Sequence, residues 1–242
     1  MPAHTIPVVG RPFARFAALV GGLTPDAALT ALRGRTLGPA HLVPGQGVTA
    51  EEWSDIEAAG AGAVTADPFL CREPVRVGVH QRDPRNVLIA DLEPVTDHHW
   101  RAAIVIHPES APLADRDNGT AHVPGMVEVE VGLQTAMAVA EQYLLPRPGA
   151  FDFTSNRVEI AFEAFMFPLQ AVVELHADRV AWSGPEVLEL DATAQIHQGG
   201  RRVMTMRFRS QAFERGLLAG LERERADAVL TRTTDPTFLE QR

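Results

Sequence analysis

Two polar side chains, four residues apart, interrupt a long apolar segment of the sequence. Glu130 and Gln134 lie within "PGMVEVEVGLQTAMAVA" (124–140), which otherwise consists mainly of Val, Met, Ala and Gly. Residues four apart are neighbours on one side of an α-helix. A buried carboxylate is costly unless it is paired or hydrogen-bonded, and such groups often serve as general acids or bases. Glu130 is therefore a candidate catalytic residue. The alternatives are that it reaches solvent or pairs with Arg157 or Arg207.

The segment around these residues has the pattern of one long, largely buried helix. The breakers "HVPG" precede it and "PRPG" follows it, which predicts a helix over 124–144. Apolar residues occupy most of its circumference, so we expect other elements to surround it. Glu128 falls with Thr135 on a different side from Glu130. We expect that side to be the wetter one.

Histidines near Glu130 in the sequence are candidates for sharing proton transfer. His122 precedes the Pro-Gly before the predicted helix, and His107 ends a predicted strand. Each also suits a purely structural position, in a turn or at a strand end. His98 and His99 in "DHHW" suggest a metal site, but adjacent histidines in a strand point to opposite faces. No CxxC or HExxH motif accompanies them, so we expect no metal.

Strand patterns on both sides of the helix predict an α+β fold, with an antiparallel sheet packed on one principal helix. The strands are expected at 75–80, 86–94, 100–108, 156–165, 169–177, 179–183, 186–198 and 202–213. Gly-Gly at 199–200 predicts a tight hairpin between the last two.

The N-terminal part predicts a small helical extension. Thr24 and Thr49 are N-cap residues for helices at 23–34 and 49–60. The chain is expected to divide into this extension at 1–74, a single α+β domain at 75–215, and a C-terminal helix with its tail at 216–242.

Composition excludes several classes of protein. The 242 residues carry a net charge of -9, with 22 Lys+Arg against 31 Asp+Glu. No basic stripe is available for nucleic acid. No apolar run approaches the ~18 residues of a membrane span. The single cysteine, Cys71, cannot form an internal disulfide. We expect a cytoplasmic protein.

The block "HVPGMVEVEVGLQ" resembles the signature of the A-factor biosynthesis hotdog family. In that family His-Val-Pro-Gly-Met precedes a glutamate, and a glutamine follows four residues later. The matching positions are His122, Val123, Pro124, Gly125, Met126, Glu130 and Gln134. The similarity covers about 79–213, including "VHQRDPRNVLI" and "VEIAFEAFMFPL". The chain departs from the family in three ways. Leu133 replaces an arginine, Glu128 adds an acid, and one hotdog unit stands where many members have two.

The resemblance implies a hotdog fold, in which a curved antiparallel sheet wraps around one long central helix. Two units usually pair, so it implies a homodimer. The substrate would be an acyl thioester on an acyl carrier protein or coenzyme A, and no cofactor is expected. Glu130, with His122 or His107, would transfer protons. The substrate would contact Gly125, Met126, Leu133 and Gln134.

The family is associated with signalling-lactone biosynthesis in bacterial secondary metabolism. The resemblance therefore implies transfer of a β-ketoacyl chain to a small hydroxylated phosphate ester. One alternative is a β-hydroxyacyl-thioester dehydratase or thioesterase, although the upstream His-Phe-Pro element of the dehydratases is absent. Another is a non-catalytic acyl-binding or scaffolding subunit. The missing arginine favours this last alternative, and the retained Glu130 and His122 favour an enzyme.

Overall fold

A computed structural model describes residues 4–38, 40–60, 72, 74–75, 78–114 and 121–233. The strands are β1 (His4–Val8), β2 (Ala40–Pro44), β3 (Ile89–Thr96), β4 (His99–Ile104), β5 (Phe151–Phe162), β6 (Val172–Trp182), β7 (Val187–Gln198) and β8 (Arg201–Glu214). The helices are α1 (Ala14–Val20), α2 (Pro25–Arg33), α3 (Ala50–Gly60), α4 (Ala111–Ala114), α5 (Gly125–Val139) and α6 (Arg215–Thr233), with short turns η1 (Arg11–Phe13), η3 (Pro84–Asn86) and η4 (Ala140–Leu144).

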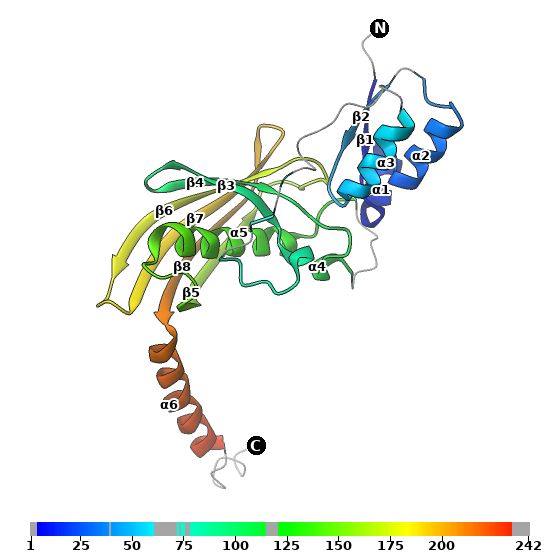
Figure 1. Cartoon of the computed structure of the whole chain (residues 1–242). Coiled ribbons are helices and arrows are strands. Elements are labelled where there is room, and N and C mark those ends of the chain that lie inside the picture. The colour runs from blue at the N-terminus through cyan, green and yellow to red at the C-terminus, as the bar shows by residue number, and fades with distance from the viewer. Residues whose placement is uncertain are drawn as a thin grey trace.

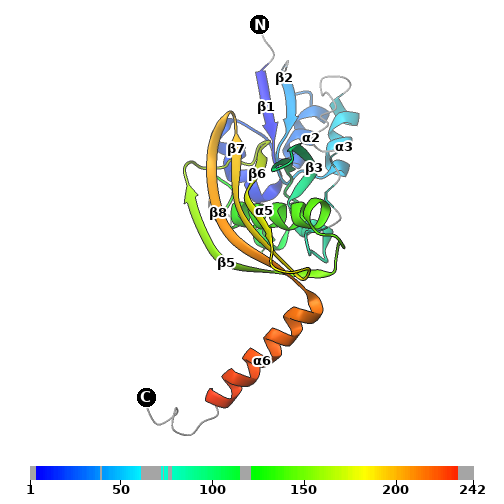
Figure 2. The ribbon, with the colours of Figure 1, turned by 90° about the vertical axis from the view of Figure 1, so that its left-hand side faces the viewer.

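A curved antiparallel sheet wraps around α5, as Figures 1 and 2 show from two sides. Its strand order is β3-β4-β6-β7-β8-β5. Buried and less buried residues alternate along β7, as a strand with one face on the core requires. Leu190 and Ile196 face inward on this strand, whereas Asp191 faces outward. The predicted α+β hotdog fold is confirmed.

The central helix lies close against the sheet because it presents a glycine there. A Cβ on Gly132 would stand 2.4 Å from Met206 Cε and 3.5 Å from Ala194 Cβ. The predicted helix over 124–144 is confirmed as α5 followed by the π-helical turn η4. The expectation of a wetter side at Glu128 and Thr135 is wrong. Their exposed fractions are 3% and 0%, because this side of the helix faces the sheet.

Two of the strand predictions differ from the structure in more than the position of their ends. The segments expected at 169–177 and 179–183 form one strand, β6, with an irregularity in its pairing. Residues 78–80, the described end of the strand expected at 75–80, form no strand. Gly78 and His80 have φ values of 86° and 53°, which turn the backbone out of an extended course. The predicted hairpin at 199–200 is confirmed, with positive φ at both glycines.

The N-terminal extension contains both strands and helices. The predicted N-cap of α3 at Thr49 is confirmed, since Glu52 N donates to Thr49 Oγ1 and Thr49 N donates to Glu52 Oε2. The prediction missed α1 and the parallel pair β1–β2. This part joins the sheet through Gln46, whose side chain donates to Ile104 O and accepts from Ile106 N. The division at residue 74 stays a prediction, and Cys71 lies outside the described residues.

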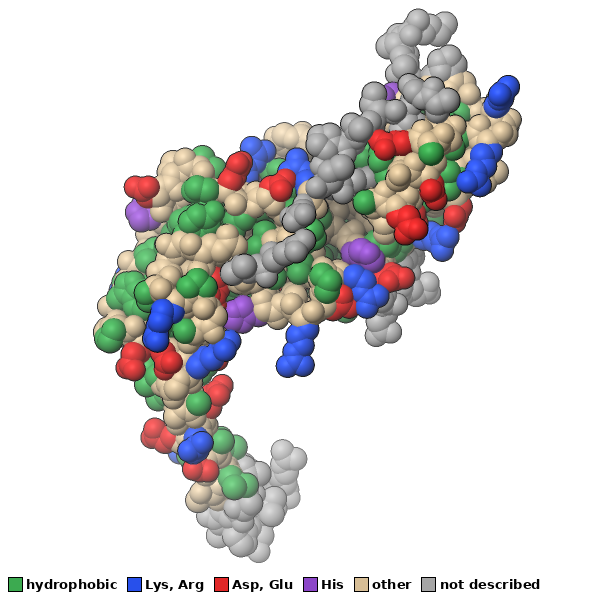
Figure 3. All heavy atoms as spheres, in the orientation of Figure 1, with side chains coloured by type: hydrophobic (Ala, Val, Ile, Leu, Met, Phe, Trp, Pro, Cys, Tyr) green, Lys and Arg blue, Asp and Glu red, His purple; other side chains and the backbone are tan. Residues whose placement is uncertain are grey.

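The last helix extends away from the body. In Figure 3, α6 forms a stalk that carries charged side chains of both signs. Within the described ranges, no helix is long and apolar enough to span a membrane.

Candidate active site

A polar line on α5 binds the segment that precedes β3. We call residues 78–88 the strap. Glu130, Gln134 and Glu141 lie along one side of the helix and its π-turn, and each of them bonds to the strap. The polar residues of this otherwise apolar helix therefore have a structural partner along its length.

Gln134 fixes the strap to the helix. Its side chain is fully buried, accepts a hydrogen bond from Leu88 N at 2.9 Å and donates to Asn86 O at 2.8 Å. The same amide donates to Glu130 Oε1 at 2.9 Å. Backbone bonds on both sides of the amide hold its orientation, so Gln134 positions Glu130 as well as the strap.

Glu130 is half-buried between the helix and the strap. Gln81 Nε2 donates a second hydrogen bond to the same oxygen, Oε1, at 3.0 Å. Within the described part of the chain, Oε2 makes no hydrogen bond. The alternative of Arg157 as its partner is not observed, since Arg157 pairs with Glu159 instead. The carboxylate is thus held through one oxygen, Oε1.

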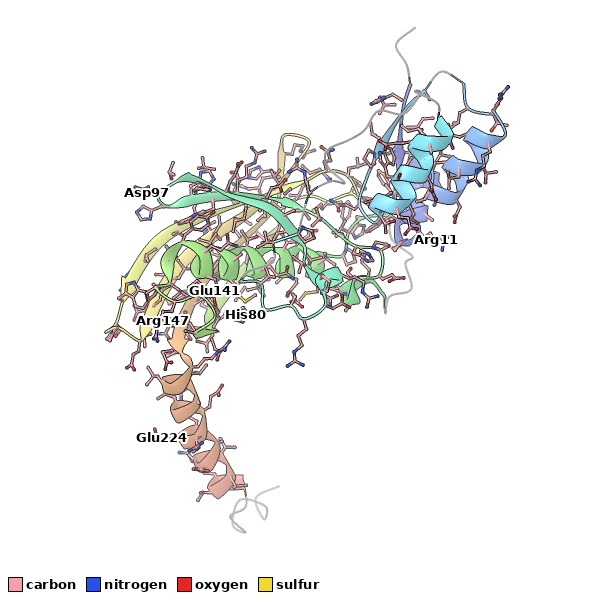
Figure 4. The ribbon with its side chains drawn as sticks, in the orientation of Figure 1. Arg11, His80, Asp97, Glu141, Arg147 and Glu224 are labelled. Atoms are coloured by element: carbon pink, nitrogen blue, oxygen red, sulfur yellow. The ribbon has the colours of Figure 1, made fainter. Side chains whose placement is uncertain are left out.

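A second carboxylate lies further along the same line. Glu141 is 1% exposed, with Oε1 3.2 Å from His80 Nε2 and Oε2 accepting from Gly149 N at 2.6 Å. Figure 4 shows His80 and Glu141 side by side at the end of α5. Both oxygens of Glu141 are engaged, so this pair anchors the start of the strap and is not a free acid.

The start of α5 lies beside a group of aromatic side chains. The His122 ring stacks on Phe165, with centroids 4.5 Å apart. A Cβ on Gly125 would stand 2.9 Å from the Phe162 ring, so this glycine lets the helix N-terminus approach the aromatic group. His122 therefore lies just before the helix N-terminus, whereas Glu130 lies further along the same helix.

His107 lies at the junction with the N-terminal extension. It lines a cavity of about 260 Å³ together with Thr49 and Val87, and neither Glu130 nor His122 lines that cavity. Its Nδ1 accepts a hydrogen bond from the backbone N–H two residues later. The structure brings Glu130 and Gln134 together, and it places His107 in a cavity that neither Glu130 nor His122 lines.

Apolar side chains remain exposed near the helix N-terminus. Met126 is 60% exposed, whereas Leu133 is partly buried against the core. We use the term apolar edge for the large exposed side chains on β5 and the segment after it, namely Val158, Ile160, Phe162, Phe165 and Phe167. Within the described residues β5 pairs with β8 alone, so this edge of the sheet is open.

Glu128 is a buried acid on the sheet side of α5. Its Oε2 has no hydrogen-bond partner among the described residues. Burial raises the pKa of Glu128 to about 7, because the charged form loses its hydration. The neutral acid therefore predominates below neutral pH. Its position separates it from Glu130, which faces the strap.

Sequence reasoning missed the strap residues Gln81 and His80. The block "VHQRDPRNVLI" carried a usable signal, because it places two polar side chains before a predicted strand. Their pairing with Glu130 and Glu141 depends on how the strap crosses the helix, and this is a tertiary property.

Comparison with known families identifies the part of the chain that contains this site. Residues 66–214 match the family model of the A-factor biosynthesis hotdog domain, AfsA. No curated protein matches the chain.

Solved structures with a similar fold have low sequence identity. The dehydratase heterocomplex ApeI:P from Xenorhabdus doucetiae is 13% identical, with a TM-score of 0.45, over 65% of this chain and 98% of that chain. A hot-dog-like protein from Thermanaerovibrio acidaminovorans is 18% identical, with a TM-score of 0.39, over 52% and 89%. A hypothetical thioesterase with coenzyme A from Streptococcus pneumoniae TIGR4 is 13% identical, with a TM-score of 0.34, over 51% and 85%.

Proposed function

The chain belongs to the A-factor biosynthesis hotdog domain family, and from that premise we propose that it processes acyl chains carried as thioesters. The reaction we infer is transfer of a β-ketoacyl chain to a hydroxyl group of a small acceptor. The observation that carries the proposal is the geometry of Glu130. Gln81 and Gln134 hold its Oε1, while Oε2 has no hydrogen bond within the described residues. A carboxylate fixed in this way is suited to general-base catalysis.

The proposed reaction accounts for each proton that is transferred and each bond that forms or breaks. Glu130 Oε2 takes the proton of the acceptor hydroxyl as the hydroxyl oxygen attacks the thioester carbonyl carbon. Free N–H groups at the start of α5, near Gly125, stabilise the oxyanion that forms. The C–S bond then breaks, and the departing thiolate receives the proton from Glu130, directly or through His122. The products are an ester and a free thiol on the carrier.

The distance along α5 between Gly125 and Glu130 suits one bound acyl group. Glu130 is five residues beyond Gly125, which corresponds to roughly 7.5 Å along the helix axis. The carbonyl at the helix N-terminus and a proton acceptor further along the helix can thus serve one bound substrate. An acyl carrier protein or coenzyme A supplies the thioester in this proposal.

A second copy of the chain completes the proposed assembly. Within the described residues β5 is an open sheet edge with exposed Val158 and Ile160, and open edges favour pairing with another strand. We infer an isologous dimer in which two β5 strands pair and cover the apolar edge.

Intact-mass spectrometry of acyl-loaded carrier proteins tests the reaction. The wild type and Glu130→Gln are incubated with β-ketoacyl and β-hydroxyacyl carriers, with and without a hydroxylated acceptor. Glu224→Gln is the matched control, because it makes the same change on exposed α6. Acyl loss that requires the acceptor is expected from the wild type and the control. Glu130→Gln is expected to be slower by about 10²–10⁴-fold.

Other outcomes distinguish other reactions. Acyl loss without an acceptor indicates a thioesterase, and loss of water from the β-hydroxyacyl chain indicates a dehydratase. If no carrier changes mass over a broad panel of acyl chains, the enzyme proposal is wrong.

A further inference from the structure

Three side chains of metal-binding type meet on the outer face of the sheet. His99 of β4 lies directly opposite His176 of β6, and Glu174 is two residues before His176 on the same strand. Alternate residues of a strand share a face, and directly opposed residues have Cβ atoms about 4.5–5.5 Å apart. All three therefore project from one face. The intervening residues Trp100 and Leu175 are buried in the core on the other face.

The donor atoms are close enough for one ion to bind them. One ligand atom from each of the three residues lies within 4.8 Å of the others. His99 Nε2 is 3.7 Å from Glu174 Oε2, and the rings of His99 and His176 stack with centroids 3.9 Å apart. Ligand atoms in a tetrahedral zinc site stand about 3.4 Å apart, so side-chain shifts of about 1 Å would complete the geometry.

One of these donor atoms lacks a hydrogen-bond partner among the described residues. His99 Nε2 is buried and has no hydrogen bond within the described part of the chain. The distance to Glu174 is too long for one. A ring nitrogen without a hydrogen bond can coordinate a metal ion.

We propose that His99, Glu174 and His176 bind one divalent transition-metal ion of the zinc class. Two imidazole nitrogens and one carboxylate oxygen suit Zn²⁺, whereas Mg²⁺ and Ca²⁺ take oxygen ligands. The side chains of His99 and Glu174 are 20% and 28% exposed, so a fourth ligand position faces solvent. Glu174 also lines a cavity of about 360 Å³, which provides an entry path.

Side chains of opposite charge, Arg101 and Glu174, lie at this site. Arg101 lies on the same face, opposite Glu174 in the register, and places a positive charge near the site. The Glu174 carboxylate offsets this positive charge for an incoming cation. The ion would tie β4 to β6 on the outer face, whereas Glu130 lies on the helix inside the sheet. The metal site and the proposed acyl chemistry are therefore independent.

Calorimetric titration of the full-length chain with ZnCl₂ tests this site. We expect one Zn²⁺ per chain in the wild type. His176→Ala and Glu174→Gln are each expected to weaken binding by at least about tenfold, because each removes a ligand. His98→Ala is the matched control, since it removes the histidine next to His99 that lies outside the cluster. It is expected to bind within about twofold of the wild type. MgCl₂ is expected to give no saturable binding.

Thermal unfolding gives a second readout. Saturating Zn²⁺ is expected to raise the Tm of the wild type and of His98→Ala, and to leave the Tm of His176→Ala unchanged. If His176→Ala does not fold by circular dichroism, Glu174→Gln decides the question. The proposal is overturned if the wild type takes up no Zn²⁺, or if the ligand variants bind as tightly as His98→Ala.

Discussion

Replacing Glu128 by glutamine is expected to stabilise the protein at alkaline pH. The side chain is 3% exposed, and burial raises its pKa from 4.5 to about 7. The folded state thus holds a proton that the unfolded state releases above pH 4.5. Stability from this group is fully present below that pH and is lost as the pH rises through 7. The difference between a pKa of 4.5 and one of about 7 corresponds to about 3 kcal/mol in total, of which about 2–3 kcal/mol disappears between pH 5 and pH 8.

Urea unfolding measured at half-unit steps from pH 5 to pH 8.5 checks this expectation, with protein concentration held constant. Glu128→Gln keeps the shape of the protonated acid and cannot ionise. The variant should match the wild type within about 1 kcal/mol at pH 5 and exceed it by about 3 kcal/mol at pH 8. Glu224→Gln on exposed α6 is the control, and it should follow the wild type within about 0.5 kcal/mol at every pH.

Parallel pH profiles for the wild type and Glu128→Gln would refute the reasoning. That result would mean that Glu128 has an ordinary pKa in the folded protein, and hence that its carboxylate is hydrated or paired.

Three further expectations concern the other elements of the site and its support. Gln134→Ala leaves a backbone N–H and a backbone C=O of the strap without their side-chain partner. Urea unfolding should therefore show that the free energy of unfolding falls by about 2–4 kcal/mol. A fall below about 1 kcal/mol would contradict the role of Gln134 in holding the strap. Ile160→Lys on β5, at the open edge, should convert the inferred dimer to a monomer in light scattering. Val95→Lys on β3, at the opposite edge of the sheet, should leave the dimer intact. A monomeric wild type would rule out the dimer. Thr49→Ala removes the N-cap of α3 and should cost about 1 kcal/mol in thermal unfolding, and an unchanged Tm would show that the cap contributes nothing.

The sequence by itself determined the features that depend on neighbouring residues. The caps of α2 and α3, the long central helix and the Gly-Gly hairpin were predictable, because each follows from residue types within a few positions. The contact between Glu130 and Gln134 was predictable for the same reason, since residues four apart meet on one side of a helix.

Only the tertiary structure decided which side of α5 faces the sheet. The periodicity of an almost wholly apolar helix leaves this orientation open, and so Glu128 was expected on the wetter side. The pairing of Glu130 with Gln81 joins residues 49 positions apart, and His99 meets His176 through the register of β4 with β6. Such contacts depend on how the whole chain arranges its strands, because register and topology are set by packing across the fold and not by any local pattern.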